Sequence, residues 1–515
     1  MRALLSVANR QGAAALARDL LALGVDVYAT DGTREQLAAE GVDVLPVGAL
    51  TDVPPLVGGL VRTFHPAVYA GILARRDRPE QLAELAEQGI GLIDLVVVNV
   101  KPFAPQVGER RVPLDEAIEM IDVGGTALLS AAARNHAGVA AVPSPAAYDQ
   151  VVAEIRDRGT VSAELRQRLA AEAFAILAAY HAQVAAYLSQ VTGATFPPHI
   201  SVVLEKVTDL AHGENPHQRA AFYRETTHRD GTLADAIRLQ GRAPSFNDLL
   251  DLDAAWRIAA DFAAPTVVVV RHTDPVGIAS DPALAAAFRR ALETDPAASF
   301  GSTVGLNRPV DEATAREVAE GTFEGLVGPG YTEEALRVLA ARPELEVLQV
   351  PPNPADGLRD YGIAALDFKR VGGGLLVETL DGTALDRGQL RVVTQRRPTL
   401  EELNDLMFAW KAAAHVRSNA IVLARNLQTV GIGGGQVSRQ VAVEIALRRA
   451  GDRARTAVMA SDAYFPFPDV IAHAAIAGVT AIIQPGGSRR DEMAIEVADR
   501  HHLAMVFTGR RHFRH

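Results

Sequence analysis

The stretch Ala481-Ile482-Ile483-Gln484-Pro485-Gly486-Gly487-Ser488 is a short apolar run that ends in a polar, glycine-rich loop. Similar loops, each following or bordering an apolar stretch, recur at residues 433–439 and 461–469, and the tail 511–515 follows Ala504-Met505-Val506-Phe507. Such runs predict buried strands, and open α/β sheets place ligands in the loops at strand ends. The pattern predicts a ligand site. A chain terminus normally frays, so this basic and aromatic tail is expected to fold back onto the protein.

Length and composition narrow the class of protein. With 515 residues and 48% hydrophobic content, the chain can form several cores and two to four domains. It has no cysteine, which excludes disulfides and thiolate metal sites and fits a reducing cytoplasm. The first apolar run is too short for a signal peptide, and no later stretch is expected to be long enough to cross a bilayer. A net charge of −11 argues against general nucleic-acid binding. We therefore expect a soluble, cytoplasmic protein that binds neither nucleic acid nor membrane.

The order of elements predicts an α/β fold with two domains. Residues 3–7, 25–29 and 95–100 read as strands and 12–23 as a helix, the alternation of a doubly wound parallel sheet. An alanine-rich helix is predicted at 162–192, before Phe196-Pro197-Pro198, where we place the boundary between domains 1–195 and 200–515. Apolar runs at 266–270 and 420–424 indicate that the second domain is also α/β, with room for two similar subdomains.

Several generic chemistries are excluded. The chain contains no Gly-x-x-x-x-Gly-Lys-Ser/Thr loop, no His-Glu-x-x-His helix and no Gly-x-Ser-x-Gly elbow. The glycine triplets at 372–374 and 433–435 lack the strand, spacing and later acid of a dinucleotide fingerprint. Without cysteine the chain cannot be a zinc nucleoside deaminase of the Pro-Cys-x-x-Cys type, and we predict no metal-ligating residues.

Two polar clusters at predicted strand ends contain histidine. His272 follows four valines, and Pro275 and Gly277 predict a turn beside it. This places His272 as a candidate general base, the alternative being a histidine whose ring is satisfied by a loop carbonyl. The second cluster, residues 212–218, includes Asn215 and His217, and its alternative interpretation is a helix-capping turn.

Two further clusters contain groups suited to anions. Lys411 and His415 have helical spacing and share a face, the alternative being a solvated basic surface. Thr30-Asp31-Gly32-Thr33 lies between a predicted strand and a predicted helix, where backbone N–H groups can bind a phosphate. Many α/β turns have this form without binding a ligand.

Together these clusters resemble, in order and spacing, one family, the bifunctional purine-biosynthesis proteins in which an AICAR formyltransferase is fused to an IMP cyclohydrolase. The resemblance covers nearly the whole chain. In the first region it is carried by Thr63 with His65-Pro66, residues 71–76 and Ile121-Asp122-Val123-Gly124-Gly125. In the second region it is carried by residues 213–218, His272-Thr273 with Pro275 and Gly277, 372–376, 408–411, 418–420, 433–439, 465–467, 484–488 and the tail.

The resemblance implies two consecutive reactions. A C-terminal region of cytidine-deaminase-like fold would transfer a formyl group from 10-formyltetrahydrofolate to the 5-amino group of AICAR. An N-terminal region of methylglyoxal-synthase-like fold would then close formyl-AICAR to IMP with loss of water. Members of the family are usually homodimers with transferase sites shared between subunits, use no redox cofactor, and in some cases hold a structural potassium ion.

Positions that match the family's motifs carry implied roles. In the transferase, His272 and Arg271 are the implied catalytic residues, and the implied substrate-binding residues are Asn215, His217, Asn247, Asn419, Arg439, Phe467, Asp469 and Arg511. Among these, Phe467 matches a stacking ring, Arg511 the phosphate-side arginine of the tail and Asp469 the acid facing the folate. In the cyclohydrolase, Asp122 and Lys101 are the implied catalytic residues, and Thr33, Arg62, Thr63 and Arg134 are substrate-binding.

The transferase region departs from the family pattern at three places. Arg271 replaces a lysine thought to help protonate the departing folate nitrogen; an arginine is a poor acid but can stabilise negative charge. Ala211-His212 replaces an Arg-Tyr pair, and Asp274 replaces an asparagine.

The cyclohydrolase region departs further. Residues 8–12 differ from the usual phosphate turn, and Leu60, Arg62 and Arg134 replace an arginine and two lysines. Positive charge remains at Arg10, Arg62 and Arg134, which suits a phosphate. Lys101 replaces a tyrosine, and an ammonium group does not reproduce the roles of a phenol.

Three hypotheses follow from this pattern. The first is an active bifunctional enzyme, supported by the intact loops of the second region. The second is a formyltransferase whose first domain has weakened or lost cyclisation, motivated by Leu60 and Lys101. The third is a non-catalytic nucleotide-binding relative, motivated by Arg271 and by Ala211-His212.

Overall fold

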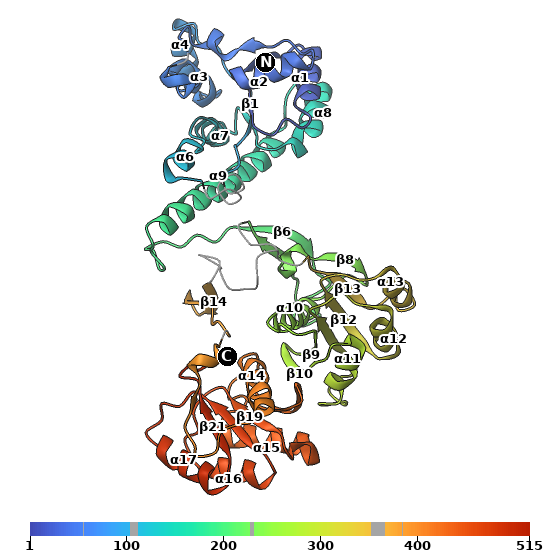
Figure 1. Ribbon diagram of the computed structural model, residues 1–515. Helices are drawn as coiled ribbons and strands as arrows, with labels where there is room; N and C mark the ends of the chain where they lie inside the picture. The colour runs from blue at the N-terminus through green and yellow to red at the C-terminus, as the bar shows by residue number, and fades with distance from the viewer. Residues whose placement is uncertain (55, 104–111, 227–230, 352–365, 384) are drawn as a thin grey trace. The chain divides into compact units, whose positions relative to one another are not determined.

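The computed structural model describes residues 1–54, 56–103, 112–226, 231–351, 366–383 and 385–515. The chain forms two compact units, Met1–Val203 and Leu204–His515 (Figure 1). The division lies shortly after Phe196-Pro197-Pro198.

The first unit is built on a parallel sheet of order β3-β2-β1-β4-β5. The predicted strands at 3–7, 25–29 and 95–100 are confirmed, and the strands are β1 Arg2–Val7, β2 Asp26–Ala29, β3 Leu45–Pro46, β4 Leu95–Asn99 and β5 Ala140–Val142. Alternate residues of β1, β2, β4 and β5 enter two separate cores, so both faces of the sheet are covered, whereas the two residues of the edge strand β3 are exposed. The α-helices of this unit are α1 Ala13–Ala22, α2 Asp31–Ala39, α3 Pro66–Leu73, α4 Pro79–Glu87, α6 Leu114–Glu119, α7 Gly124–Arg134, α8 Tyr148–Arg158 and α9 Ala163–Val191.

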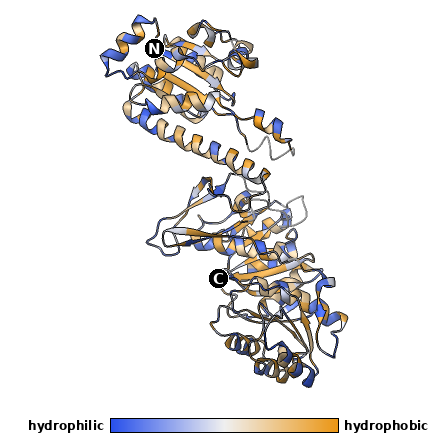
Figure 2. Ribbon diagram, turned by 90° about the vertical axis from the view of Figure 1, so that its left-hand side faces the viewer, coloured by the Kyte–Doolittle hydropathy of each residue, from blue (hydrophilic) through white to orange (hydrophobic). Residues whose placement is uncertain are grey.

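Helix α9 corrects one expectation. Over Ala163–Ser189 it is long and apolar enough to span a membrane by length and composition alone, so the statement that no stretch reaches that length was wrong. In the structure its apolar side chains enter the cores of the first unit, with Leu169, Ala173 and Leu177 among the buried residues. An alanine-rich helix packed against a sheet meets the same criterion as a membrane span; in α9, 28% of the apolar window is buried inside the structure. Figure 2 shows the hydrophobic residues along it.

The second unit contains a sheet of order β16-β21-β20-β19-β17-β18-β10-β9-β11-β12-β13-β8. Its strands are β8 Ile237–Gln240, β9 Thr266–Arg271, β10 Asp274–Ser280, β11 Ser302–Leu306, β12 Phe323–Gly328, β13 Glu346–Gln349, β16 Arg391–Val392, β17 Ile421–Arg425, β18 Gln428–Gly433, β19 Val458–Ser461, β20 Ala481–Gln484 and β21 Ala504–Phe507. The strand order is symmetric about the central β10–β18 pair: each strand of the first half has a counterpart in the second half at the same distance from that pair. The predicted pair of similar subdomains is therefore present (Figure 1).

The helices repeat in the same way. Helices α10 Phe246–Ala260 and α14 Leu400–Ala414 cover one face of the sheet and share one core. The opposite face is covered in the first half by α11 Leu284–Leu292, α12 Glu312–Glu320 and α13 Glu333–Leu339, and in the second half by α15 Arg439–Ala450, α16 Asp469–Ile476 and α17 Asp491–Arg500. Both α10 and α14 begin with a capping box, at Ser245 and Thr399.

Two hairpins of this unit stand outside the large sheet. They are β6 Leu204–Asp209 with β7 Ala221–Glu225, and β14 Leu366–Val371 with β15 Gly374–Thr379. All six residues of β6 are exposed. Two-stranded ribbons of this kind are marginally stable alone in water.

The turn expected at Pro275 and Gly277 lies elsewhere. Both residues are inside β10, and the two-residue turn between β9 and β10 is His272-Thr273. Gly277 instead allows a close approach, since a Cβ atom there would lie 2.0 Å from the carbonyl oxygen of Ala291. Glycine is required at position 277 because helix α11 packs closely against the strand there, and not because the chain turns.

Candidate functional site

The polar loops of the second unit meet at one edge of its large sheet. Strands β19, β20 and β21 are parallel, so the loops that follow them emerge on the same side. Antiparallel pairing brings the end of β18, the start of β17 and the β9–β10 turn to that same edge. The topology therefore gathers the regions around His272, Asn419 and Arg439 and the chain terminus, which are far apart in the sequence.

His272 and Thr273 form a strained turn. Their φ angles are 56° and 64°, a left-handed conformation that is unfavourable for a β-branched residue such as Thr273. Asp251 on α10 holds the turn by accepting the backbone N–H of His272 (3.1 Å) and of Thr273 (2.6 Å). Burial raises the pKa of Asp251, although these two hydrogen bonds oppose the shift. The His272 side chain is exposed, and among the described residues its ring has no hydrogen-bond partner, so the alternative of a ring satisfied by a loop carbonyl is wrong.

Two further segments hold the same turn. Arg417 donates its backbone N–H to Asp274 Oδ1 (2.9 Å) and its Nη2 to Thr273 Oγ1 (3.2 Å). Arg514 donates Nη1 to the carbonyl oxygen of Thr273 (3.3 Å) and to that of His415. Arg271, beside the turn, donates Nη1 to the carbonyl oxygen of Phe300 (2.5 Å).

The C-terminal tail is folded back, as expected. His512 is buried, donates its backbone N–H to the carbonyl oxygen of Asp462 (3.1 Å) and places Nδ1 2.6 Å from Asp381 Oδ2. The Arg514 carbonyl accepts the N–H of Ser418 (2.9 Å). Arg511 is exposed, with its guanidinium 4.2 Å from the centre of the Phe513 ring.

A buried ion pair lies behind the tail. Arg439, the first residue of α15, donates Nη1 to Asp462 Oδ1 and to Ser461 Oγ (3.0 Å). Asp462 is fully buried, and its second oxygen accepts the hydroxyl of Ser418 at 2.6 Å. Asn419, next along the chain, donates Nδ2 to the carbonyl oxygen of Gln436 (2.7 Å). Two residues predicted to bind substrate are thus fixed in different ways: Asn419 by Gln436 in the loop that joins β18 to α15, and the Arg439 side chain by Ser461 and Asp462 at the end of β19.

Phe467 borders a cavity of about 470 Å³. The cavity is lined by Tyr464, Pro466, Phe467, Gly487, Ser488, Arg489 and Arg490. The Arg490 guanidinium lies 5.2 Å from the centre of the exposed Phe467 ring. Asp469 is exposed at the start of α16, two residues after Phe467. A planar ring system and an anionic group could bind there.

The loop at 212–218 lies against the N-terminus of α10. Asn247, in the first turn of α10, donates Nδ2 to the carbonyl oxygen of Glu214 (3.2 Å). Asn215 donates Nδ2 to Gln218 Oε1 (2.9 Å), and His217 is exposed. Since Asn247 and Asp251 are one helical turn apart, this loop adjoins the His272 turn.

Lys411 and His415 share a face, but it is not a solvated basic surface. Both contact Asp261, the C-cap of α10, with Lys411 Nζ 3.7 Å from Oδ1 and His415 Nε2 3.1 Å from Oδ2. Thr383 also donates its hydroxyl to Asp261 (2.6 Å). Burial opposes ionisation of Asp261, yet these partners lower its pKa to about 2, and burial lowers the pKa of His415. The cluster is an ionised carboxylate with a neutral imidazole and an ammonium group, and it joins α10 to α14.

In the first unit, Asp122 is held by three neighbours. Its carboxylate accepts the backbone N–H of Lys101 (3.2 Å) and of Gly125 (2.7 Å), and its own N–H donates to the hydroxyl of Tyr180 (2.6 Å). Burial raises the pKa of Tyr180. The Lys101 side chain is exposed. The structure therefore brings Asp122 and Lys101 together, through the Lys101 backbone.

The remaining predicted residues of the first unit divide into two groups. The Thr33 hydroxyl accepts the N–H of Val7 (3.0 Å), and Arg62 Nη1 lies 3.7 Å from Asp31 Oδ2, so the predicted phosphate turn and Arg62 are neighbours. The buried Thr63 lies beside Gly124, whose Cβ atom, if present, would be 3.8 Å from the Thr63 hydroxyl. Arg134 is exposed at the last position of α7, about 15 Å along the helix from Gly124.

Sequence reasoning missed Asp251, Asp261 and Tyr180. One signal for Asp251 was available, because Asp251-Leu252-x-x-Ala255-Trp256 recurs as Asp405-Leu406-x-x-Ala409-Trp410. The interval between these copies equals that between Ser245 and Thr399, so it marks the internal repeat. Nothing local marks Asp261 or Tyr180, whose contacts are distant in sequence.

Comparison with known proteins identifies relatives of this chain. The family model described as AICARFT/IMPCHase bienzyme matches residues 132–449, and the MGS-like domain model matches residues 12–127. The chain is 43% identical to the bifunctional purine biosynthesis protein PurH of Anoxybacillus flavithermus, over 100% of this chain and 99% of that protein. It is 42% identical to the protein of the same name from Bacillus subtilis, with the same coverage.

A solved structure titled "Crystal structure of ForH" is 39% identical, with a TM-score of 0.32, and covers 36% of this chain and 96% of that one. The family models together span both units, and the named relatives align over the whole chain. The chain therefore belongs to the AICARFT/IMPCHase bienzyme family, with an MGS-like domain in its first unit.

Proposed function

We propose that this chain catalyses the last two steps of IMP synthesis. Formyl transfer from 10-formyltetrahydrofolate to AICAR takes place in the second unit, and dehydrative closure of formyl-AICAR to IMP takes place in the first. The observation that carries the transferase assignment is the His272 ring, which is exposed and has no hydrogen-bond partner among the described residues, on a turn held by Asp251, Arg417 and Arg514. A side chain with this placement is free to accept a proton from substrate.

In the transfer step, the 5-amino nitrogen of AICAR attacks the formyl carbon. His272 takes the proton that this nitrogen loses, and the bond from the formyl carbon to the folate nitrogen breaks, with that nitrogen taking up a proton. Arg271 stabilises the negative charge that develops on the formyl oxygen, since a guanidinium does not readily give up a proton. Arg439, Asn419 and Arg511 bind the nucleotide, and Phe467 and Asp469 face the folate.

In the cyclisation step, the carboxamide nitrogen attacks the formyl carbon and water is lost. Asp122 accepts the proton from the attacking nitrogen, and two backbone N–H groups hold its carboxylate in position. Thr33, Arg62 and Thr63 provide the hydroxyl and guanidinium groups that bind the phosphate. Lys101 and Arg134 supply positive charge.

A second candidate function has one observation in its favour. Lys101 replaces a phenol and its side chain is exposed, and α7 carries Arg134 away from Asp122. A formyltransferase with a weakened first domain would show this arrangement. It differs from the leading proposal only in the rate of IMP formation.

The resemblance implies a potassium ion in some members of the family, and potassium can be held by oxygen atoms such as backbone carbonyls. The buried carboxylate of Asp462 is paired with Arg439 and hydrogen-bonded by Ser418, so we do not assign it to a cation. Among the described residues there is also no cluster of three or more His, Cys, Asp or Glu side chains. We assign no residue to potassium, and no step depends on it.

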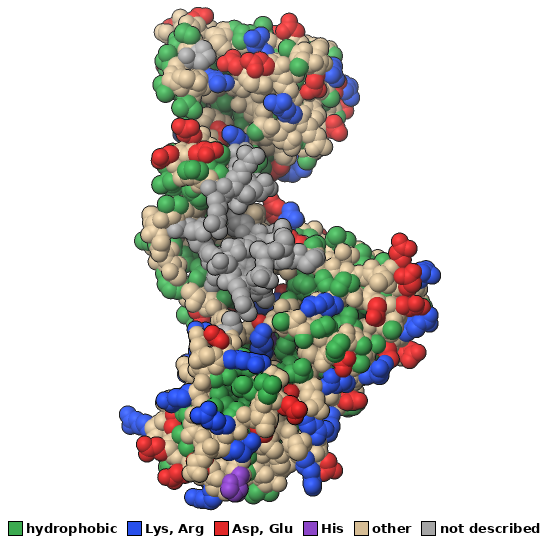
Figure 3. Space-filling view, in the orientation of Figure 1, with side chains coloured by type: hydrophobic (Ala, Val, Ile, Leu, Met, Phe, Trp, Pro, Cys, Tyr) green, Lys and Arg blue, Asp and Glu red, His purple; other side chains and the backbone are tan. Residues whose placement is uncertain are grey.

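We propose a homodimer as the working state. The hairpins β6–β7 and β14–β15 leave Leu204, Val207, Leu375 and Leu376 between 48% and 62% exposed. An apolar hollow of about 410 Å³ lies between β7 and α10. Hydrophobic side chains are exposed beside Lys and Arg on the second unit in Figure 3. A second copy would cover such apolar surface, and light scattering across a dilution series measures the molar mass that tests it.

The product of the reaction tests the function. Purified protein is incubated with AICAR and 10-formyltetrahydrofolate, and formyl-AICAR and IMP are separated by chromatography. IMP as the end product supports both activities. Accumulated formyl-AICAR without IMP supports the second candidate, and neither product, with AICAR binding intact, supports a non-catalytic relative.

A further inference from the structure

The turn that carries His272 has a counterpart in the other half of the second unit. The turn between β17 and β18 is Asn426-Leu427, with φ angles of 54° and 56°. Asp405 on α14 accepts the N–H of Asn426 (2.8 Å) and of Leu427 (2.7 Å), as Asp251 does for the other turn. The two turns therefore have the same backbone and the same acidic support.

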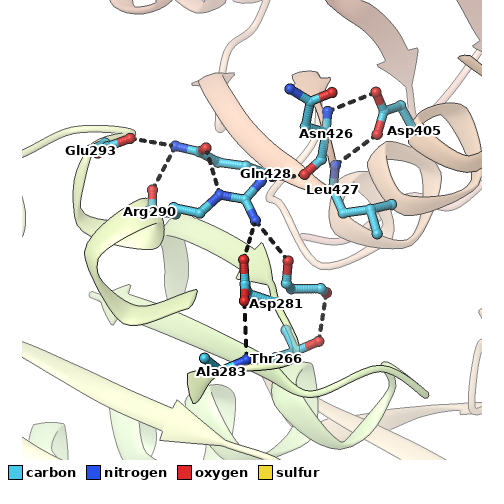
Figure 4. A network of polar contacts seen from close by, with 10 residues as sticks. Thr266, Asp281, Ala283, Arg290, Glu293, Asp405, Asn426, Leu427 and Gln428 are labelled. Atoms are coloured by element: carbon cyan, nitrogen blue, oxygen red, sulfur yellow. Dashed lines mark hydrogen bonds and ion pairs between the residues drawn. The ribbon is translucent and has the colours of Figure 1, made fainter. Parts of the chain in front are cut away.

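Each turn also receives an arginine at a backbone carbonyl. In the Asn426 turn, Arg290 of α11 donates Nη2 to the carbonyl oxygen of Asn426. It also donates to the Ser280 carbonyl (3.0 Å) and to Gln428 Oε1 (3.2 Å), within the network of Figure 4. In the His272 turn the arginine is Arg514, near the end of the chain, and it donates to the carbonyl oxygen of the second turn residue, Thr273, where Arg290 uses that of the first, Asn426.

The origin of the two arginines differs. Arg290 lies on α11, which packs on the large sheet. The arginine that supports the Asn426 turn therefore comes from a regular helix of the fold. Arg514 is the penultimate residue and is placed by its backbone, whose N–H donates to Ser418 Oγ (3.2 Å) and whose carbonyl accepts the Ser418 N–H (2.9 Å). The Arg514 side chain is partly buried, and burial lowers the pKa of its guanidinium.

We propose that Arg514 is a positioning residue for formyl transfer, which fixes the His272-Thr273 turn through the carbonyl oxygens of Thr273 and His415. Its guanidinium connects the turn to the end of α14, whose Lys411 and His415 are anchored on Asp261. Without it, the Thr273 carbonyl loses a charged donor and the strained turn is held mainly by Asp251 and Arg417. Small displacements of a catalytic group can cost about 100-fold in rate.

The inference rests on the proposed transferase function, and the full-length protein supplies an internal reference in its cyclisation activity. The kcat and the KM for AICAR in formyl transfer, the kcat for cyclisation and the Tm are measured for Arg514→Ala, Arg514→Met and Arg514→Lys. We expect Arg514→Ala and Arg514→Met to lower the transfer kcat about 10- to 100-fold. The KM for AICAR and the cyclisation kcat should stay within about threefold, and Arg514→Lys should recover part of the loss because it retains a charged donor.

Arg290→Ala is the matched control. It removes the arginine from the other turn and should lower the Tm at least as much, while the transfer kcat stays within about threefold at a temperature where the protein is folded. A wild-type level of transfer in Arg514→Ala would overturn the inference, as would a rise in KM with unchanged kcat or an equal loss in Arg290→Ala. If the wild-type protein transfers no formyl group, the proposed function fails instead.

Discussion

The two halves of the second unit build the same hairpin turn and use it differently. In the first half the turn carries an exposed histidine, and one of its hydrogen bonds comes from Arg514 near the chain terminus. In the second half the turn holds Asn426 and Leu427 and is enclosed by Arg290, Gln428 and Ser280. The comparison shows that the strained backbone and its aspartate belong to the fold, because both copies have them. The chemistry depends on the side chain at one turn and on what surrounds it.

The largest expected effect comes from removing the His272 side chain, compared with the equivalent Asn426 side chain of the other turn. His272→Ala should lower the transfer kcat about 100- to 10,000-fold, because the proton of the attacking amine loses its acceptor. Asn426→Ala, the same change at the other turn, should stay within about threefold. Steady-state rates of formyl-AICAR formation measure both. Retained transfer in His272→Ala would rule out its role as the base.

The next prediction concerns the two aspartates. Asp251→Ala and Asp405→Ala each leave two backbone N–H groups without an acceptor and should each destabilise the protein by about 1–3 kcal/mol. Only Asp251→Ala should also lower the transfer kcat, by about tenfold or more. Urea unfolding and transfer rates measure the two effects. Equal loss of transfer in both variants would mean that Asp251 contributes stability and no positioning.

A third prediction uses a buried carboxylate present in one half only. Glu346 begins β13, where Ala504 begins the matching strand β21, and neither of its carboxylate oxygens has a hydrogen-bond partner among the described residues. Burial raises the pKa of Glu346 to about 7. The folded protein then holds a proton that the unfolded chain has released, so stability falls as the pH rises from about 4.5 to 7.

A shift of the pKa from 4.5 to about 7 corresponds to a loss of roughly 3 kcal/mol over this range, and the attraction of Arg238 at 3.4 Å, which lowers the pKa, is already contained in that value. Glu346→Gln should remove this part of the pH dependence, which unfolding curves of both proteins at pH 5 and pH 8 would show. An unchanged difference between the two pH values in the variant would contradict the assignment.

The smallest effect is expected at the arginines that precede the turns. Arg271→Lys should change the transfer kcat by less than about threefold if charge stabilisation suffices. Arg425→Lys, at the matching position, should have no effect on transfer. An increase of tenfold or more in the transfer kcat of Arg271→Lys would show that the wild-type protein lacks a group able to protonate the leaving folate nitrogen. Arg271 would then impair catalysis.

The predicted strands and long helix were largely correct because their signals are local. Apolar runs such as 266–270 and 420–424 fall in β9 and β17, and residues 162–192 contain α9. The turn at His272 was predicted at the wrong residues because the side chain that stabilises it lies on helix α10, distant in the sequence. Asp251 accepts both N–H groups, which allows residues with poor turn propensity to adopt positive φ, whereas Pro275 and Gly277 are strand residues.

The alternation of strands and helices, the polar loops at strand ends and the motifs that identify the family can all be read along the chain. These depend on hydrophobic period and on residue types within short windows. The folded arrangement is needed to see that Asp251, Arg417 and Arg514 meet at one turn, that Asp261 pairs with Lys411 and His415, and that Tyr180 supports Asp122. These contacts join residues far apart along the chain, and the order in which strands pair, which no local window contains, brings them together.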